Sequence, residues 1–435
     1  MKKIYIIWAW WIWISWIARY YNENWYKVFW SDSCKSELIE QLNKEWINIK
    51  VWIFPENIDK SFEKAIYTEA VPLEQEEIKK VKELWIPLQT YPEALADIAN
   101  KKRLIAIAWT HWKSTTTSLL SIMMKDSKLW VNTLVWTILK EFGNKNTYFS
   151  NSDFFTLEAC EYKRSFVKYK PEFTIITNID LDHLDYFKDL EDYISAYREL
   201  IANMKEWWYV VISWYCQNSK TLIWLREDIN FVEVFENSFT LNWKNHKIDE
   251  FKLNVPWWHI KFDANLAYVL WVILWIEKSH IKTSLETYSW VWRRMETVKL
   301  TQNNNRIMSD YWHHPEEIIP TLKAIRQGYK PNKLIVCFQP HQYSRTIELL
   351  EWFRNCFWEA DTLIVPDIYE SRDSKEDKEK MPPEKFIKQI NHKDKIYWDW
   401  LERTWKILQN LDSEHKDSII LLLWAWDVDN LRNYF

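Results

Sequence analysis

Short apolar runs alternate with longer amphipathic stretches along the whole chain. A short apolar run is typical of a buried strand, whereas apolar residues spaced three or four positions apart are typical of a helix. Strands are predicted at residues 3–7, 27–32, 104–107, 173–177, 209–212, 334–338, 362–366 and 419–423, with another near Arg306. This alternation predicts an α/β protein with parallel sheets.

The alternation restarts twice, which indicates more than one domain. We place the boundaries near residues 99 and 297, and a chain of 435 residues is long enough for three domains. The predicted domains are residues 1–98, 99–296 and 297–435. The charged stretch Ser371–Lys380 is expected to be a polar surface loop and not a linker between domains.

The composition is unusual in two residue types, because the chain has 33 Trp and only 2 Gly. Average usage would give about 30 Gly in a chain of this length. With glycine at each Trp, residues 8–16 would read G-x-G-G-x-G-x-S-G, and residues 109–115 would read G-T-H-G-K-S-T. Loops of this kind need residues without a Cβ, because backbone N–H groups must close on phosphate oxygens.

We therefore hypothesise that most of the Trp positions are glycine in the natural protein. The explanation would be a host that reads UGA as Gly and a translation that reads it as Trp. Under the alternative, the Trp residues are genuine, and the chain should fold poorly and bind no nucleotide.

Charge and cysteine content exclude several classes of protein. The net charge is -4 with 27% charged residues, so neither a nucleic-acid partner nor a membrane-surface partner is indicated. The five cysteines form no C-x-x-C pair, which suits a reducing cytosol. The N-terminus resembles a signal peptide, but with glycine restored it becomes a strand and a phosphate loop that lead to Arg19, so a cytoplasmic protein without membrane insertion is expected.

The first loop predicts a site for a nucleotide that carries a diphosphate. Its candidate residues are Trp8, Ala9, Trp10, Trp11, Ile12, Trp13 and Ser15, together with Asp32 at the end of the second strand. An acidic residue at that place can accept a ribose hydroxyl, although Asp32 could equally be a helix cap or a solvated loop residue. The same loop on its own would also fit a nicotinamide-dependent oxidoreductase.

The second loop is a more specific signal, because it follows a predicted strand and has the P-loop spacing. The residues predicted to bind ATP are Trp109, Thr110, His111, Trp112, Lys113, Ser114 and Thr115. Lys113 would reach the β- and γ-phosphates, and the Ser114 hydroxyl would coordinate Mg²⁺. Carboxylates at later strand ends, at Glu158 and within Thr177–His183, are the hard ligands that Mg²⁺ prefers. A histidine at a strand end, such as His183, is by itself more often structural than catalytic.

With these motifs the chain resembles the Mur ligase family over nearly all of its 435 residues. The motifs occur in family order and at family-like spacing. They are residues 8–16, 109–115, 158–166, 177–185, 293–294, 310–316, 338–346, 367–369 and 424–427.

The resemblance implies a Rossmann-like N-terminal domain that binds a UDP-sugar, a central P-loop ATPase domain and a Rossmann-like C-terminal domain that binds an amino acid. It also implies ATP-dependent addition of L-alanine to UDP-N-acetylmuramate through an acyl phosphate, in peptidoglycan synthesis, with ATP and Mg²⁺ as cofactors. By analogy, Lys113, His183, Arg345 and His313 are catalytic, while Ser114, Glu158 and His183 hold metal. Tyr311, His313 and Arg345 would line the amino-acid pocket, and Arg294 and Asp310 would meet the nucleotide. A monomer or weak homodimer is expected.

Two positions depart from the family pattern. Gln342 stands where members often have Arg, and the run 257–263 keeps His259 but loses both asparagines of H-N-x-x-N. Three alternatives stay open: a muramic-acid ligase with another acceptor such as a recycled peptide, the oxidoreductase suggested by the first loop, and a non-catalytic scaffold if the Trp residues are genuine. The ATP motif and the strand-end carboxylates argue against the oxidoreductase, because hydride transfer needs no ATP site.

Overall fold

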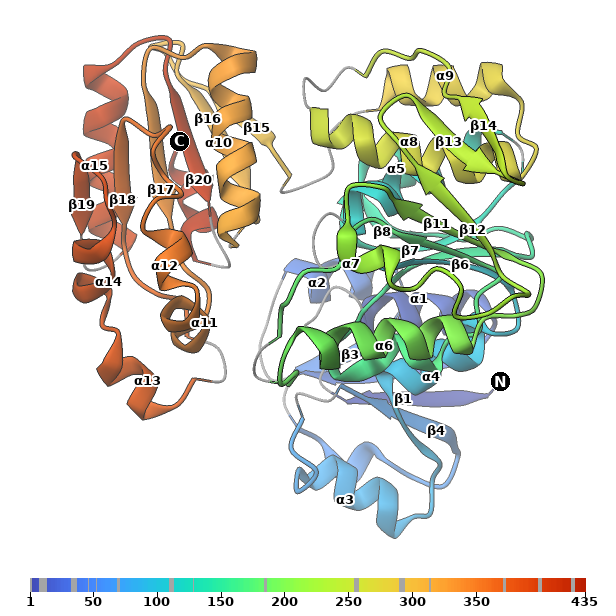
Figure 1. Cartoon of the computed structure of the whole chain (residues 1–435). Helices are drawn as coiled ribbons and strands as arrows, with labels where there is room; N and C mark the ends of the chain where they lie inside the picture. The colour runs from blue at the N-terminus through green and yellow to red at the C-terminus, as the bar shows by residue number, and fades with distance from the viewer. Residues whose placement is uncertain are drawn as a thin grey trace. The chain divides into compact units, whose positions relative to one another are not determined.

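The computed structural model describes the chain apart from residues 1, 8–13, 33–36, 46, 52, 69–70, 109–112, 128, 184–185, 254–257, 289–293, 313, 371–372, 398–400 and 424–426. The chain forms two compact units, the first ending at Tyr288 and the second running from there to the C-terminus. The predicted α/β class is confirmed, because the two units contain three sheets flanked by helices (Figure 1).

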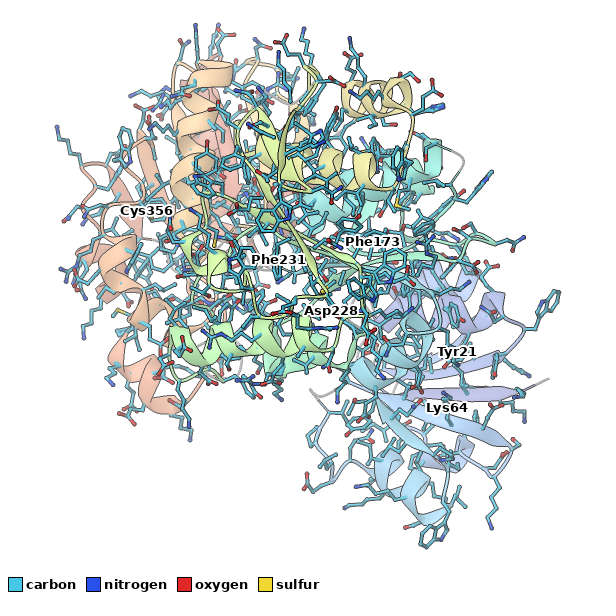
Figure 2. The ribbon with its side chains drawn as sticks, turned by 45° about the vertical axis from the view of Figure 1, so that its right-hand side comes forward. Tyr21, Lys64, Phe173, Asp228, Phe231 and Cys356 are labelled. Carbon is cyan, nitrogen blue, oxygen red and sulfur yellow. The ribbon has the colours of Figure 1, made fainter. Side chains whose placement is uncertain are left out.

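The first sheet has five parallel strands in the order β3-β2-β1-β4-β5, which is the Rossmann order. The strands are β1 (Lys3–Ile7), β2 (Lys27–Asp32), β3 (Asn48–Val51), β4 (Phe62–Tyr67) and β5 (Leu88–Thr90). The helices are α1 (Ile14–Glu23), α2 (Glu37–Lys44), η1 (Pro55–Asn57), α3 (Glu76–Glu83) and α4 (Tyr91–Ala99). Figure 2 shows Lys64 of β4 beside Tyr21 of α1, with the ammonium 5.6 Å from the ring centroid.

The second sheet has nine strands in the order β14-β13-β12-β11-β10-β6-β9-β7-β8. The strands are β6 (Arg103–Ala108), β7 (Asn132–Leu139), β8 (Lys145–Tyr148), β9 (Phe154–Ala159), β10 (Phe173–Ile176), β11 (Tyr209–Ser213), β12 (Asn230–Val234), β13 (Ser238–Leu241) and β14 (Lys244–Lys247). The helices are α5 (Lys113–Asp126), η2 (Lys140–Phe142), η3 (Tyr162–Lys168), α6 (Leu190–Ala202), α7 (Gln217–Lys220), α8 (Trp258–Ile273) and α9 (Lys278–Thr287). In the middle of the sheet, β6 lies between β9 and β10 and runs parallel to both.

The second unit is built on a six-stranded sheet in the order β15-β16-β20-β17-β18-β19, with β15 alone antiparallel to its neighbour. The strands are β15 (Glu296–Leu300), β16 (Arg306–Asp310), β17 (Leu334–Phe338), β18 (Thr362–Val365), β19 (Lys395–Tyr397) and β20 (Ile419–Leu423). The helices are α10 (Pro315–Tyr329), α11 (Tyr343–Glu348), α12 (Leu350–Phe353), α13 (Lys375–Lys380), α14 (Pro383–Gln389), α15 (Leu401–Glu414) and η4 (Val428–Tyr434).

The strands predicted from apolar runs are confirmed, and several of them, such as β6, β17 and β20, are almost continuous apolar segments buried on both faces. The prediction of a loop at Ser371–Lys380 was wrong for its second half, which is α13. Ser374 caps that helix in a capping box with Asp377, and this local pairing starts a helix even in a highly charged stretch.

Among the described residues, seven Trp have a left-handed backbone that L-amino acids other than glycine rarely adopt. They are Trp25, Trp85, Trp130, Trp207, Trp224, Trp243 and Trp275, with φ between +46° and +74°, and all seven side chains are exposed. Such positions are where the backbone itself favours glycine.

Three of these residues follow helices in the same hydrogen-bonding pattern. After α3, Trp85 N–H donates to Lys82 and Ile86 N–H donates to Val81, which defines a Schellman motif with Trp85 at its left-handed position. The same two hydrogen bonds, from the Trp N–H and from the N–H of the next residue, occur at Trp25 after α1 and at Trp275 after α8. Glycine is the usual residue at this position.

The hairpin between β13 and β14 is joined by Asn242 and Trp243, both with positive φ. A two-residue turn with two positive φ angles is type I′, for which Asn-Gly is the preferred sequence. Trp16 differs from these residues, because its indole is buried, stacks on Phe155 and donates to the Thr133 carbonyl at 3.0 Å.

Within the described part of the chain, no helix has the length and apolar character needed to cross a lipid bilayer.

Candidate functional site: a buried lysine between two glutamates

The candidate nucleotide site lies where β10, β6 and β9 end side by side. Parallel neighbours bring their carboxyl ends to one edge of a sheet, and ligands of open α/β sheets bind at such edges. The chain leaves β6 toward α5, which begins at Lys113. Glu158 is the penultimate residue of β9, and His183 lies in the segment that follows β10.

The first turn of α5 contributes Lys113, Ser114 and Thr115, all of them buried. The Lys113 ammonium contacts Glu161 Oε2 at 2.6 Å, and the side chains are 10% and 1% exposed. The Ser114 hydroxyl donates to Glu158 Oε2 at 3.1 Å. The structure thus brings together the predicted lysine, serine and Glu158, and adds Glu161.

The charges of this buried pair support each other. Burial lowers the pKa of Lys113, but the nearby carboxylates, Glu161 first among them, outweigh burial and leave it above its usual value. Burial raises the pKa of Glu161, yet the charge of Lys113 and the contact with His183 bring it below its usual value. Both groups are therefore ionised at neutral pH.

His183 is held from two sides. Its Nε2 lies 3.4 Å from Glu161 Oε1, and its ring lies 4.7 Å from the Tyr162 ring. The His183 backbone is left-handed, with a φ of +56°. Non-glycine residues in such conformations cluster at functional sites, where the surrounding structure holds them.

Trp136 of β7 also belongs to this site, although sequence reasoning did not single it out. Its backbone N–H donates to Glu158 Oε1 at 2.6 Å, and its ring centroid lies 5.7 Å from the Lys113 ammonium. An indole therefore occupies space beside the lysine that would meet the phosphates.

Hard oxygen donors suitable for Mg²⁺ are present in this site, namely the Ser114 hydroxyl and the Glu158 carboxylate, which already touch. Among the described residues, however, no group of three or more His, Cys, Asp or Glu side chains is preassembled to hold a metal ion. A bound ion would therefore take part of its coordination from the nucleotide or water.

Two residues of the predicted UDP-sugar site can be placed. Ser15 is buried in α1 and accepts from Arg19 Nη1 at 3.3 Å, while Asp32 is fully buried at the end of β2. The other residues predicted for this site, Trp8, Ala9, Trp10, Trp11, Ile12 and Trp13, lie outside the described residues. The same holds for Trp109, Thr110, His111 and Trp112 of the P-loop and for His313.

In the second unit, the predicted residues gather at the carboxyl ends of β16 and β17. The Arg294 guanidinium lies 3.6 Å from the Trp312 ring centroid and 5.6 Å from that of Tyr311. Arg345 of α11 lies 3.4 Å from His341 Nδ1 through its Nη1, and the His341 ring stacks on Tyr369.

Asp310 closes β16 and is fully buried, with Oδ2 accepting from Met295 N–H at 3.0 Å. Burial raises the pKa of Asp310 to about 8, although the charge of Arg294 opposes that shift.

The positions that depart from the family pattern are buried as well. Gln342, where family members often have Arg, is buried and has a φ of +68°. Asp263, at the end of the altered 257–263 run, is buried in α8, and burial holds its pKa well above the usual range.

Comparison with known proteins assigns this arrangement to a family. Residues 107–267 match the model of the Mur ligase middle domain, and residues 14–103 match the Mur ligase family catalytic domain. The UDP-N-acetylmuramate–L-alanine ligase of Acetivibrio thermocellus is 36% identical over 362 residues, covering 79% of this chain and 76% of that protein. The chain belongs to the Mur ligase family. The ligase of the same name from Alkaliphilus metalliredigens is 33% identical, covering 86% of this chain and 85% of its own length.

Solved structures agree on the fold of this Mur ligase. The UDP-N-acetylmuramate-alanine ligase MurC of Thermotoga maritima gives a TM-score of 0.81 at 22% identity, covering 100% of this chain and 98% of its own. A murein peptide ligase from Psychrobacter arcticus gives 0.73 at 15% identity, with coverage of 100% and 98%. The family resemblance read from the motifs is thus confirmed.

Proposed function

We propose that this Mur ligase joins L-alanine to UDP-N-acetylmuramate with conversion of ATP to ADP and phosphate, as a cytoplasmic step of peptidoglycan precursor synthesis. The observation that carries the ATP part is the buried Lys113 at the start of α5, with Ser114 against Glu158 on the neighbouring strand. The acceptor and donor follow from relatives with this activity in their names, at 31–36% identity over most of the chain.

Each residue of the nucleotide site has a separate task in this proposal. A carboxylate is a poor acceptor for an amine, so ATP must first phosphorylate it, and Lys113 would stabilise the charge of the transferring phosphoryl group. Ser114, Glu158 and His183 are the residues that would hold Mg²⁺, which supplies charge neutralisation on the phosphates when bound. The first turn of α5 would direct its backbone N–H groups to the phosphates.

We propose that the second unit binds the amino acid. Arg345 can pair with the α-carboxylate of alanine through a charge-assisted contact, and Tyr311 would help to limit the side chain to a methyl group. His313 is proposed for the same pocket, while Arg294 and Asp310 are proposed to meet the nucleotide.

We further propose that most Trp residues of this chain are glycine in the natural protein. The left-handed Trp residues after three helices and in the β13–β14 turn support this proposal, since glycine is the residue that these motifs favour. At Trp136, glycine would also clear the space beside Lys113. We do not extend the proposal to Trp258 and Trp292, where family members usually carry a side chain.

A survey of acceptors tests the function. The full chain, with glycine wherever the gene carries UGA, is incubated with ATP, Mg²⁺ and UDP-N-acetylmuramate, and ADP and product are measured with each amino acid. L-Alanine should be the best acceptor. Serine and glycine should react slowly, because a small apolar pocket discriminates a methyl group by only about 1–3 kcal/mol. A preference for D-glutamate or an intact peptide would assign the chain to another member of the family.

A further inference from the structure

Glu161 lies directly after β9 and contacts two residues of the nucleotide site at once. Its Oε2 is 2.6 Å from the Lys113 ammonium, and its Oε1 is 3.4 Å from His183 Nε2. We propose that Glu161 is a positioning residue whose carboxylate bridges Lys113 and His183 and holds both in place for phosphoryl transfer. This inference rests on the proposed ligase function.

The bridge needs both the charge and the length of a glutamate. One carboxylate oxygen accepts a hydrogen bond from the Lys113 ammonium and the other contacts the His183 ring, so the side chain connects the start of α5 with the segment after β10. A glutamine has only one acceptor oxygen and would lose one of the two contacts. An aspartate is one methylene shorter and would reach only one partner from the same backbone position.

The backbone after Glu161 is built to keep the carboxylate in place. Lys163 and Arg164 are consecutive left-handed residues, with φ of +51° and +54°. Arg164 then ties this turn to α6, donating to Asp192 Oδ1 at 2.6 Å and to Ser195 Oγ at 2.7 Å. Strain of this kind persists only where the surroundings hold it, and here it fixes the direction of Glu161.

The carboxylate has opposite effects on nucleotide binding and on catalysis. It keeps a buried ammonium ionised and directed, because an unpaired buried charge would be costly. Its own negative charge, however, lies close to the expected place of the phosphates and opposes their binding. Removing the charge should therefore slow phosphoryl transfer without weakening the affinity for ADP.

The test compares Glu161→Gln and Glu161→Asp with the parent, using the full chain with glycine wherever the gene carries UGA. We expect kcat to fall about tenfold or more in Glu161→Gln and about fivefold in Glu161→Asp, from lost orientation at the phosphoryl group. ADP affinity, measured by calorimetry in EDTA so that no metal contributes, should be unchanged or higher in Glu161→Gln.

Glu172→Gln is a matched control. Glu172 is also a buried carboxylate between two cations, Arg103 at 2.8 Å and Lys205 at 3.0 Å, at the opposite end of the same strands. The Glu172→Gln variant should have lower thermal stability than the parent, while its kcat and its ADP affinity should stay near the parental values.

A Glu161→Gln variant whose kcat stays within twofold of the parent would overturn the inference, as would a joint fall of kcat and ADP affinity. If that variant does not fold, a Glu161→Asp variant with parental kcat would overturn it equally. A parent without ATP-dependent ligation would instead overturn the ligase proposal on which the inference rests.

Discussion

At the scale of single residues, Lys113 is the side chain on which ATP chemistry depends most. It is buried at the start of α5 and paired with Glu161, so Lys113→Ala removes the only side-chain cation that the described part of α5 places in its first turn. In the full chain with glycine wherever the gene carries UGA, we expect Lys113→Ala to abolish ATP-dependent ligation. Glu158→Ala and His183→Ala should each cost about 10²-fold or more by loss of metal positioning.

Release of ADP in a coupled assay measures this effect. Lys125→Ala is the control, since Lys125 lies in the last turn of the same helix and donates to the Glu141 carbonyl. Near-normal turnover in Lys113→Ala would exclude the P-loop mechanism.

Arg345 should determine how alanine is held. The arginine is expected to pair with the α-carboxylate, so Arg345→Ala should raise the KM for alanine or lower kcat by about 10²-fold. The ATP KM should change little. Arg354→Ala, which removes an arginine that pairs with Glu351 elsewhere in the second unit, is the control for steady-state kinetics with varied alanine. An unchanged alanine KM and kcat in Arg345→Ala would remove this residue from the pocket.

Asp310 should make stability depend on pH. Its pKa is about 8 in the folded protein and near 3.8 when unfolded, so between these values the folded state holds a proton that the unfolded state has released. The contribution of Asp310 to the free energy of unfolding is therefore greatest below about pH 4 and decreases as the pH rises toward 8. Asp310→Asn should flatten the melting temperature between pH 5 and pH 8.

Circular dichroism melts at several pH values test this effect. Asp361→Asn is the control in the same unit, because the hydrogen bond from Leu334 N–H and the pairing with Arg326 lower the pKa of Asp361 despite partial burial. Asp361 is ionised in both states over this pH range, so its removal should shift all melting temperatures equally. An equal pH slope in Asp310→Asn and in the parent would contradict the assignment.

At the scale of elements, the left-handed Trp residues after helices identify where the backbone favours glycine. Trp85 and Trp275 are 91% and 93% exposed, so their indoles contribute little packing while the backbone adopts an unfavourable φ. In a chain that keeps Trp only at the tested position and carries glycine at the other UGA codons, Trp85→Gly and Trp275→Gly should each stabilise the fold by about 1 kcal/mol.

Two controls separate backbone from side-chain effects in thermal melts. Trp85→Ala removes the indole but keeps a Cβ, so it should stabilise less than Trp85→Gly. Trp352 lies inside α12 and is also exposed, and Trp352→Gly should destabilise by about 1 kcal/mol because glycine is unfavourable within a helix. A loss of stability in both Trp85→Gly and Trp275→Gly would argue against glycine at these positions.

At the scale of the whole molecule, the gene sequence tests the origin of the Trp residues. Most Trp codons should be UGA, including those for Trp8, Trp10, Trp11, Trp13, Trp16, Trp109, Trp112, Trp312, Trp424 and Trp426. UGG codons in the two phosphate loops would contradict the proposal.

The chain with Trp at all these positions should fold poorly, and restoring glycine at Trp109 and Trp112 alone should not rescue it, because other turns also require glycine. Circular dichroism and activity of the printed, partly restored and fully restored chains measure this; a printed chain that is folded and active would refute it.

The sequence by itself determined the strands and the family. Strands such as β6 and β17 were predictable because continuous apolar runs reflect burial on both faces, which is a local property. The helix after the P-loop followed from its motif, and α13 could have been predicted from the Ser374–Asp377 capping box. The glycine proposal also began with local patterns, although the left-handed φ angles became visible only in the structure.

Only the tertiary structure decided which side chains meet. Lys113 and Glu161 are 48 positions apart, and they meet because β9 lies beside β6 in the sheet. The sequence singled out Glu158 as a metal ligand but gave no reason to connect Glu161 with both Lys113 and His183. It also could not show that Asp310 is buried. The order of parallel strands and the burial of a polar group depend on packing between distant segments, and no local pattern of residues records that packing.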